Sequence, residues 1–323
     1  HTMGSSCSRD ILATDKQDAK HSWDAGNDTV DTPNNNNTSL LAVKFVNGEK
    51  IVIFKYVGER DEWPICHEVP VDGIFRTFIV QQYMLFIDWT NAKRICCYDI
   101  TTRAIRTLEP IKNEVYMHYF AAEFEGNLYL FADIMDKRKV NVWDPVMDSW
   151  SQAPKLNVAR EHAAAVSHRG YLYVAGGRKD YLFNSELRSV ERYDPRRRRW
   201  QRCADLLQAR CAAGLVSAGT FLYIVGGECS EIPTNMVECY DAQINKWTQL
   251  LCMQVPKHYP ACAFYNNSLL ACGGPTLDQD CRIVEEFNAA QNKWLRKNSM
   301  PSQGPYSYVI VTPTWLRQLE STN

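Results

Sequence analysis

The chain has no long apolar run. None of its 323 residues falls in a stretch that approaches the roughly 18–20 consecutive apolar residues of a membrane-spanning helix. The N-terminus lacks the charged-then-apolar pattern of a secretory signal, and His1–Ser6 is typical of an expression-vector remnant. The net charge is −1, which argues against strong non-specific attraction to nucleic acid or anionic membrane. We therefore expect a soluble globular protein.

The sequence also lacks the usual signatures of catalytic and metal sites. Its seven histidines show no His-x-x-x-His or His-Glu-x-x-His spacing, and Gly-x-Ser-x-Gly and P-loop patterns are absent. The twelve cysteines are scattered without a Cys-x-x-Cys pair, as free thiols in a reducing compartment are. We expect a cytoplasmic or nuclear protein with no enzymatic activity and no cofactor. A role as redox sensors is left open for Cys229 and Cys281, which lie in or near loops.

What the chain does contain is a repeated unit. Between Arg160 and Trp200, three apolar runs of strand length are separated by turn residues. Gly176-Gly177 closes the second run, and Tyr193-Asp194 begins seven residues before Trp200. The same step recurs, ending at Trp150, Trp247 and Trp294, and in weaker form at Trp63 and Ile105. In chain order these six anchors lie 42, 45, 50, 47 and 47 residues apart. This period, with four short strands in each unit, predicts the blades of a β-propeller.

Gly-Gly, then Tyr-Asp, then Trp at these spacings resembles the kelch repeat, from about Leu40 to Thr312. Residues 156–177 (LNVAREHAAAVSHRGYLYVAGG) are similar to kelch-like proteins that carry BTB and BACK domains. The resemblance implies a protein-binding module, the substrate-recognition domain of a cullin-RING E3 ubiquitin ligase adaptor. BTB and BACK domains outside this chain would engage the cullin ligase. Two alternatives remain, an actin-associated cytoskeletal kelch scaffold and a copper-oxidase-type propeller.

The two ends of the repeat region predict how the ring closes. Only three strands open it, over Leu40–Phe45, Lys50–Tyr56 and Trp63–Val69, and a lone run Tyr306–Val311 ends it. We predict that this last run completes the first blade, because pairing removes two exposed sheet edges. The prediction is an all-β, six-bladed propeller with four antiparallel strands per blade.

The expected domains are a propeller over 39–313, flanked by two other segments. Residues 1–38 are expected to be a tag remnant and a disordered linker, and 314–323 a C-terminal tail. Six Asp and two Lys between Asp10 and Asp31 give the linker a net charge of −4 over that stretch. A second interpretation is that this acidic arm docks on a basic face of its own propeller.

The candidate binding site lies on one face of the ring, here called the loop face. This face carries the loops that join each fourth strand to the next blade and each second strand to the third. Kelch proteins of the BTB class, which the chain resembles, bind partner peptides there. Basic residues recur just before the first strands, so we predict a mouth for an acidic peptide. Aromatic loop residues add anchors. The candidate residues are Arg76, His118, Arg160, His162, Arg178, Tyr181, Phe183, Arg210, Lys257, His258, Tyr259 and Tyr306.

The run Arg196–Arg199 has the most conspicuous charge in the chain. It could indicate nuclear import or nucleic-acid contact. It falls between the third and fourth strands of its blade, so we place it on the opposite face as a solvated turn. We expect no nucleic-acid or membrane partner.

Overall fold

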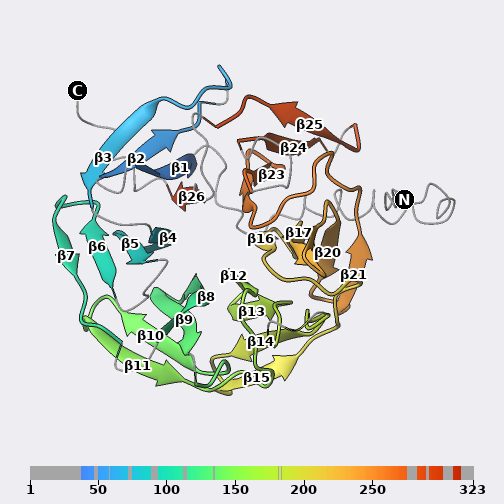
Figure 1. Ribbon diagram of the computed structural model, residues 1–323, viewed down its shortest axis with the longest axis horizontal. Coiled ribbons are helices and arrows are strands. Elements are labelled where there is room, and N and C mark those ends of the chain that lie inside the picture. Colours follow the sequence, from blue (N-terminus) through green and yellow to red (C-terminus); the bar gives the residue numbers. More distant parts are fainter. Residues whose placement is uncertain are drawn as a thin grey trace, which may run out of the picture. The chain divides into compact units, whose positions relative to one another are not determined.

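Six four-stranded antiparallel sheets follow one another around a ring in the computed structural model (Figure 1). Each sheet is a blade, with its first strand innermost and its fourth strand at the rim. The predicted all-β, six-bladed propeller is confirmed. The structure describes residues 38–313 except 47–49, 58, 72–74, 89–93, 112–114, 134, 181, 183, 275–281, 289–290 and 301–307. The expected linker and tail lie outside these residues, apart from Thr38.

The first three blades are the less regular half, and in blades 2 and 3 the strand at the rim is shorter than the innermost strand. Blade 1 contains β26 (Tyr308–Pro313), β1 (Thr38–Val46), β2 (Lys50–Lys55) and β3 (Ile65–Pro70). Blade 2 contains β4 (Phe75–Val80), β5 (Tyr83–Asp88), β6 (Ile95–Asp99) and β7 (Ile105–Thr107). Blade 3 contains β8 (Val115–Phe124), β9 (Asn127–Asp133), β10 (Val140–Asp144) and β11 (Ser149–Ala153).

The last three blades are the more regular half. Blade 4 contains β12 (Ala164–His168), β13 (Tyr171–Ala175), β14 (Val190–Asp194) and β15 (Arg199–Arg202). Blade 5 contains β16 (Gly214–Ala218), β17 (Phe221–Val225), β20 (Val237–Asp241) and β21 (Lys246–Gln249). Blade 6 contains β22 (Ala261–Tyr265), β23 (Ser268–Cys272), β24 (Val284–Asn288) and β25 (Lys293–Lys297). A small hairpin that the sequence did not predict, β18 (Glu228–Cys229) with β19 (Ile232–Pro233), lies in the loop after β17.

The ring closes through the C-terminal strand, as predicted. β26 pairs antiparallel with β1, with Leu41 opposite Ile310. On the other side of blade 1, Leu40 and Trp63 share one apolar cluster with Ala263 and Val284 of blade 6. Burial of this cluster joins the first and last blades without any covalent link. None of the described residues belongs to a helix that is long and apolar enough to cross a membrane.

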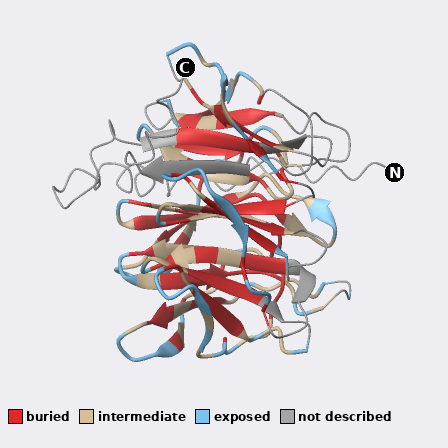
Figure 2. Cartoon of the chain, turned by 90° about the vertical axis from the view of Figure 1, so that its left-hand side faces the viewer, coloured by how far each residue is buried: buried red, intermediate tan, exposed pale blue. Residues whose placement is uncertain are grey.

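The signature Trp residues connect neighbouring blades. Trp200 of blade 4 packs into the cluster shared with blade 3, and its Nε1 donates to the carbonyl of Pro154, just after β11. Trp247 of blade 5 and Trp294 of blade 6 make the equivalent bonds, each to the blade before its own. A Trp suits this position because its ring buries a large apolar area while its single N–H finds a partner. Figure 2 shows the result, buried residues running through the stacked sheets.

In blades 4, 5 and 6 a diglycine follows the second strand, where the chain is crowded. Gly227 has φ +96°, in the left-handed region that disfavours other residues. A Cβ there would lie 2.5 Å from the carbonyl oxygen of Cys211. Its N–H donates to the carbonyl of Lys257, which precedes the next blade. The diglycine therefore ties one blade to the start of the next.

Candidate functional site

Three equivalent triplets enter the inner strands of blades 4, 5 and 6. They are Arg160-Glu161-His162, Arg210-Cys211-Ala212 and Lys257-His258-Tyr259. Each begins with a cation, and this recurrence is what predicted a ring of basic slots. The first and the third positions of the triplet have different roles in the structure.

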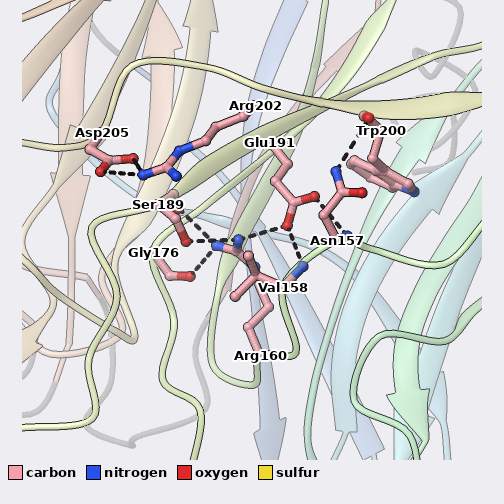
Figure 3. Close-up of polar contacts among 9 residues, drawn as sticks. All are labelled: Asn157, Val158, Arg160, Gly176, Ser189, Glu191, Trp200, Arg202 and Asp205. Carbon is pink, nitrogen blue, oxygen red and sulfur yellow. Dashed lines mark hydrogen bonds and ion pairs between the residues drawn. The ribbon is translucent and has the colours of Figure 1, made fainter.

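The first residue of the triplet is part of the scaffold. Arg160 is 2% exposed, and its Nη2 lies 2.9 Å from Oε1 of Glu191 on β14 (Figure 3). Its Nη1 donates to the carbonyl of Gly176. The carboxylate of Glu191 also accepts the backbone N–H groups of Asn157 and Val158. The ion pair thus holds the loop that enters blade 4 against the third strand of that blade.

The same buried pair recurs in the next two blades. Nη2 of Arg210 lies 2.6 Å from Oε1 of Glu238, and Nζ of Lys257 lies 3.7 Å from Oε2 of Glu285. Burial lowers the pKa of Lys257, although Glu285 opposes the shift. The prediction that Arg160, Arg210 and Lys257 neutralise the acids of a partner is wrong, because these cations are buried and each is paired within its own blade.

The third residue of each triplet has a left-handed backbone conformation. His162, Ala212 and Tyr259 all have φ near +50°. Their backbones form a chain across three blades. The N–H of Ala212 donates to the carbonyl of His162 at 2.8 Å, and the N–H of Tyr259 donates to that of Ala212 at 2.9 Å. This strained conformation is one that a loop adopts only when its surroundings hold it there.

Side chains from blades 2, 4 and 6 lie close together beside these loops. The guanidinium of Arg76, in β4 rather than before it, lies 5.1 Å from the ring centre of Tyr259 and 5.2 Å from that of Tyr119. The ring of Tyr259 lies 5.5 Å from that of His162 and 4.4 Å from that of His258. Arg178 joins this group, since its Nη2 lies 3.2 Å from Nε2 of His162. We call Arg76, His162, Arg178, His258 and Tyr259 the central cluster.

Two carboxylates lie beside the central cluster. Oε1 of Glu161 lies 3.5 Å from Nε of Arg178, and its Oε2 lies 2.8 Å from Nζ of Lys137. Glu228 lies 3.2 Å from Nε2 of His258. Burial lowers the pKa of His258, Glu228 opposes this, and the positive charges of Arg178 and Arg76 lower the pKa further.

Sequence reasoning missed Tyr119, Glu161 and Glu228 as site residues, because the same residue type does not recur at their positions in the other blades. It also missed the buried glutamates, although a signal for them exists. A Glu stands two residues before the aromatic of each regular third strand, as Glu191, Glu238 and Glu285. Its recurrence together with the triplet cation indicates an internal pair.

Several predicted site residues cannot be placed. Tyr181, Phe183 and Tyr306 lie outside the described residues. His118 lies in β8, and its side chain is not among those described. The structure therefore brings together five of the candidate residues, those of the central cluster.

The described cysteines are free thiols, and Cys281 lies outside the described residues. Sγ of Cys211 donates to Oε1 of Glu228 at 3.2 Å. Burial and the nearby carboxylate both raise the pKa of Cys211, which keeps this thiol protonated. Across the described part of the chain, no three His, Cys, Asp or Glu side chains gather to form a metal site.

The Arg196–Arg199 run lies where the sequence places it, at the turn between β14 and β15. These residues are exposed. The turn is at the opposite ends of the strands from the triplets, on the face that we call the turn face. The expectation of a solvated turn away from the candidate site is confirmed.

Comparison with known proteins agrees with this architecture. The kelch motif matches residues 159–207 and 209–254, which are blades 4 and 5, each with its entry loop. No curated protein matches the sequence. A solved structure described as "Structure of YjhT" is similar, with 16% identity, a TM-score of 0.61, and coverage of 72% of this chain and 86% of that one. At this identity the likeness concerns the fold alone. The chain thus carries kelch motifs in a six-bladed β-propeller.

Proposed function

We propose that this propeller is a protein-interaction module that captures a short segment of a partner protein at the central cluster. One observation carries the proposal, the convergence of Arg76, His162 and Tyr259 from three alternate blades. Loops that a rigid scaffold brings together are where binding residues concentrate. The kelch motifs fit protein binding in general.

The favoured partner segment is acidic. The described groups around the cluster comprise three cations, Arg76, Arg178 and Lys137, against the carboxylates of Glu161 and Glu228. An incoming carboxylate that approaches Arg178, whose side chain is partly exposed, would be held by a charge-assisted hydrogen bond. Tyr259 and His258 would supply flat surfaces for the remainder of the peptide.

The finer role follows from the resemblance to BTB-BACK-kelch proteins. We propose that the module selects substrates for a cullin-RING ubiquitin ligase, without catalysis of its own and without a cofactor. The ligase would be engaged by domains outside this chain, in the cytoplasm or nucleus. Co-purification of a cullin with the full-length gene product tests this part. An actin filament co-purified instead would favour the scaffold alternative.

Binding at the cluster is tested with a displayed library of random peptides panned on residues 38–313. The selected peptides should be rich in Asp and Glu, and their affinity should fall as salt rises. We expect Arg178→Gln and Tyr259→Ala each to weaken binding at least fivefold. Both side chains are partly exposed, so both variants should fold.

The matched control is Arg296→Gln, at an exposed arginine on the outer strand β25. It should leave the affinity unchanged. Peptides whose binding is insensitive to Arg178→Gln and Tyr259→Ala would move the site away from the central cluster. Neutral peptides that bind without salt dependence would refute the acidic motif.

A further inference from the structure

A second candidate site lies on the turn face, away from the central cluster. A cavity of about 450 Å³ opens there between blades 3 and 4. Blade 3 contributes Glu125 from the turn between β8 and β9. Blade 4 contributes Arg169 from the β12–β13 turn and Tyr171 at the start of β13. It also contributes Asp194 at the end of β14, and Pro195 and Arg196 from the β14–β15 turn. Two turns therefore bring one arginine each to the same cavity.

The fold does not require arginine in this turn. What the turn needs is the Asp at its start, since Oδ1 of Asp194 accepts the N–H groups of Arg196 and Arg197. Asp144 and Asp241 do the same in blades 3 and 5, where Val146 and Gln243 occupy the position of Arg196. Four consecutive arginines are thus an addition to the repeat in one blade.

The two cavity arginines are not committed to other groups. No hydrogen bond or ion pair among the described residues engages the guanidinium of Arg169 or of Arg196. Asp194, by contrast, is already paired with Arg197, whose Nη1 lies 3.1 Å from Oδ2. Of the two acids that line the cavity, only Glu125 is left to offset Arg169 and Arg196, and the exposed Arg198 and Arg199 lie in the same turn.

One wall of the cavity is a fixed aromatic surface. The guanidinium of Arg192 stacks 4.5 Å from the ring centre of Tyr171, and Arg192 is itself held by Oε1 of Gln201. This fixed ring and the ring of Pro195 offer apolar surface next to the two free guanidinium groups. Such a combination suits a peptide that carries a compact dianion better than a bare ion.

We propose that this cavity binds a phosphorylated serine or threonine in an exposed segment of a partner protein, with Arg169 and Arg196 holding the phosphate. A phosphate group carries a charge of about −1.5 to −2 and three acceptor oxygens, which matches two arginines from separate turns. A single carboxylate has a charge of −1 and two acceptor oxygens, so it would balance the charge of one of them. This site is independent of the peptide site on the loop face.

A nucleic acid fits the surface less well. A bound strand would present successive phosphates to an extended basic stripe. The equivalent turns of the neighbouring blades end instead in Asp148 and Asn245. A run of four arginines thus occurs in the turn of one blade, which suits recognition of one phosphate.

The test uses three fluorescent heptapeptide pools with a fixed central residue, phosphoserine, serine or glutamate, and fluorescence anisotropy. The phosphoserine pool should bind the wild-type propeller at least fivefold more tightly than either other pool. Arg169→Gln/Arg196→Gln should weaken that binding at least tenfold. Both side chains are exposed, so an unchanged melting curve is expected and is measured in parallel.

The matched control is Arg103→Gln, at an exposed arginine in the equivalent turn of blade 2. It should change the affinity less than twofold. Equal loss in this control, or equal binding of the glutamate pool, would overturn the proposal. So would a single-stranded oligonucleotide that binds more tightly than the phosphoserine pool and is released by Arg169→Gln/Arg196→Gln.

Discussion

Arg210 and Glu238 form an ion pair that is sealed from solvent, with 2.6 Å between Nη2 and Oε1 and 0% exposure of both side chains. The guanidinium also donates to the carbonyls of Gly226 and Met236, and the carboxylate accepts from Leu207 and Gln208. Buried charges are tolerated only when such partners replace water. The pair therefore joins the diglycine, the third strand and the entry loop of blade 5.

Removal of one member of this pair should be strongly destabilising. Arg210→Met leaves the Glu238 carboxylate buried without its cation, so we expect a loss of about 3–5 kcal/mol in the free energy of unfolding. Urea unfolding followed by tryptophan fluorescence measures it. Arg210→Lys should lose less, because Lys257 occupies the same position in blade 6. Arg199→Ala, at an exposed arginine, is the control and should stay within about 0.5 kcal/mol.

The crowded diglycine should tolerate no side chain. Gly227→Ala combines a left-handed backbone with a contact of 2.5 Å to the carbonyl of Cys211, and should cost about 2–4 kcal/mol. Gly219→Ala isolates the backbone effect, since Gly219 has φ +56° with no atom near the added Cβ. It should cost about 1 kcal/mol. Equal losses in urea unfolding would contradict the close approach.

Stability should fall in mild acid because of His168. This ring is 3% exposed, its Nδ1 lies 2.9 Å from Oγ of Ser217, and burial together with the nearby Arg169 lowers its pKa to about 4. The unfolded chain, with an ordinary histidine pKa near 6.5, binds the proton first as the pH falls. The stabilisation is thus present above about pH 6.5 and is lost progressively toward pH 4.

The measurement is the free energy of unfolding at pH 7 and pH 5 for the wild type and for His168→Gln. The wild type should lose about 2 kcal/mol more than the variant over this interval. The difference between the two proteins removes the contributions of other titrating groups. Identical pH dependence would mean that the buried ring is protonated in the folded state.

Most cysteines should resist alkylation in the folded protein. Burial raises the pKa of Cys97, Cys239 and Cys272 to about 12, so these thiols carry almost no reactive thiolate at neutral pH. Iodoacetamide labelling followed by mass spectrometry should modify them only after denaturation. Cys229, half-buried in the β18–β19 hairpin, should be modified earlier. Native labelling of Cys272 at the rate of Cys229 would contradict this.

The fold could be predicted largely from the sequence, because the residues that each structural element requires recur in several repeats. A strand end that needs glycine, a turn that needs Asp and a packing position that needs Trp recur at nearly the same spacing. The candidate site could be read only in part. Arg76, His162, Arg178, His258 and Tyr259 were identified as site residues, yet nothing in their spacing shows that three alternate blades bring them together.

The sequence by itself determined the number of blades, the closing strand and the face that carries the Arg196–Arg199 turn, since these follow from local strand patterns and their order. Only the tertiary structure decided which of the repeated cations are available. Arg160, Arg210 and Lys257 occupy the recurring position, but each lies within reach of a buried Glu about thirty residues later in the chain. Desolvation then forces each pair to form, because an isolated buried charge is too unfavourable to persist.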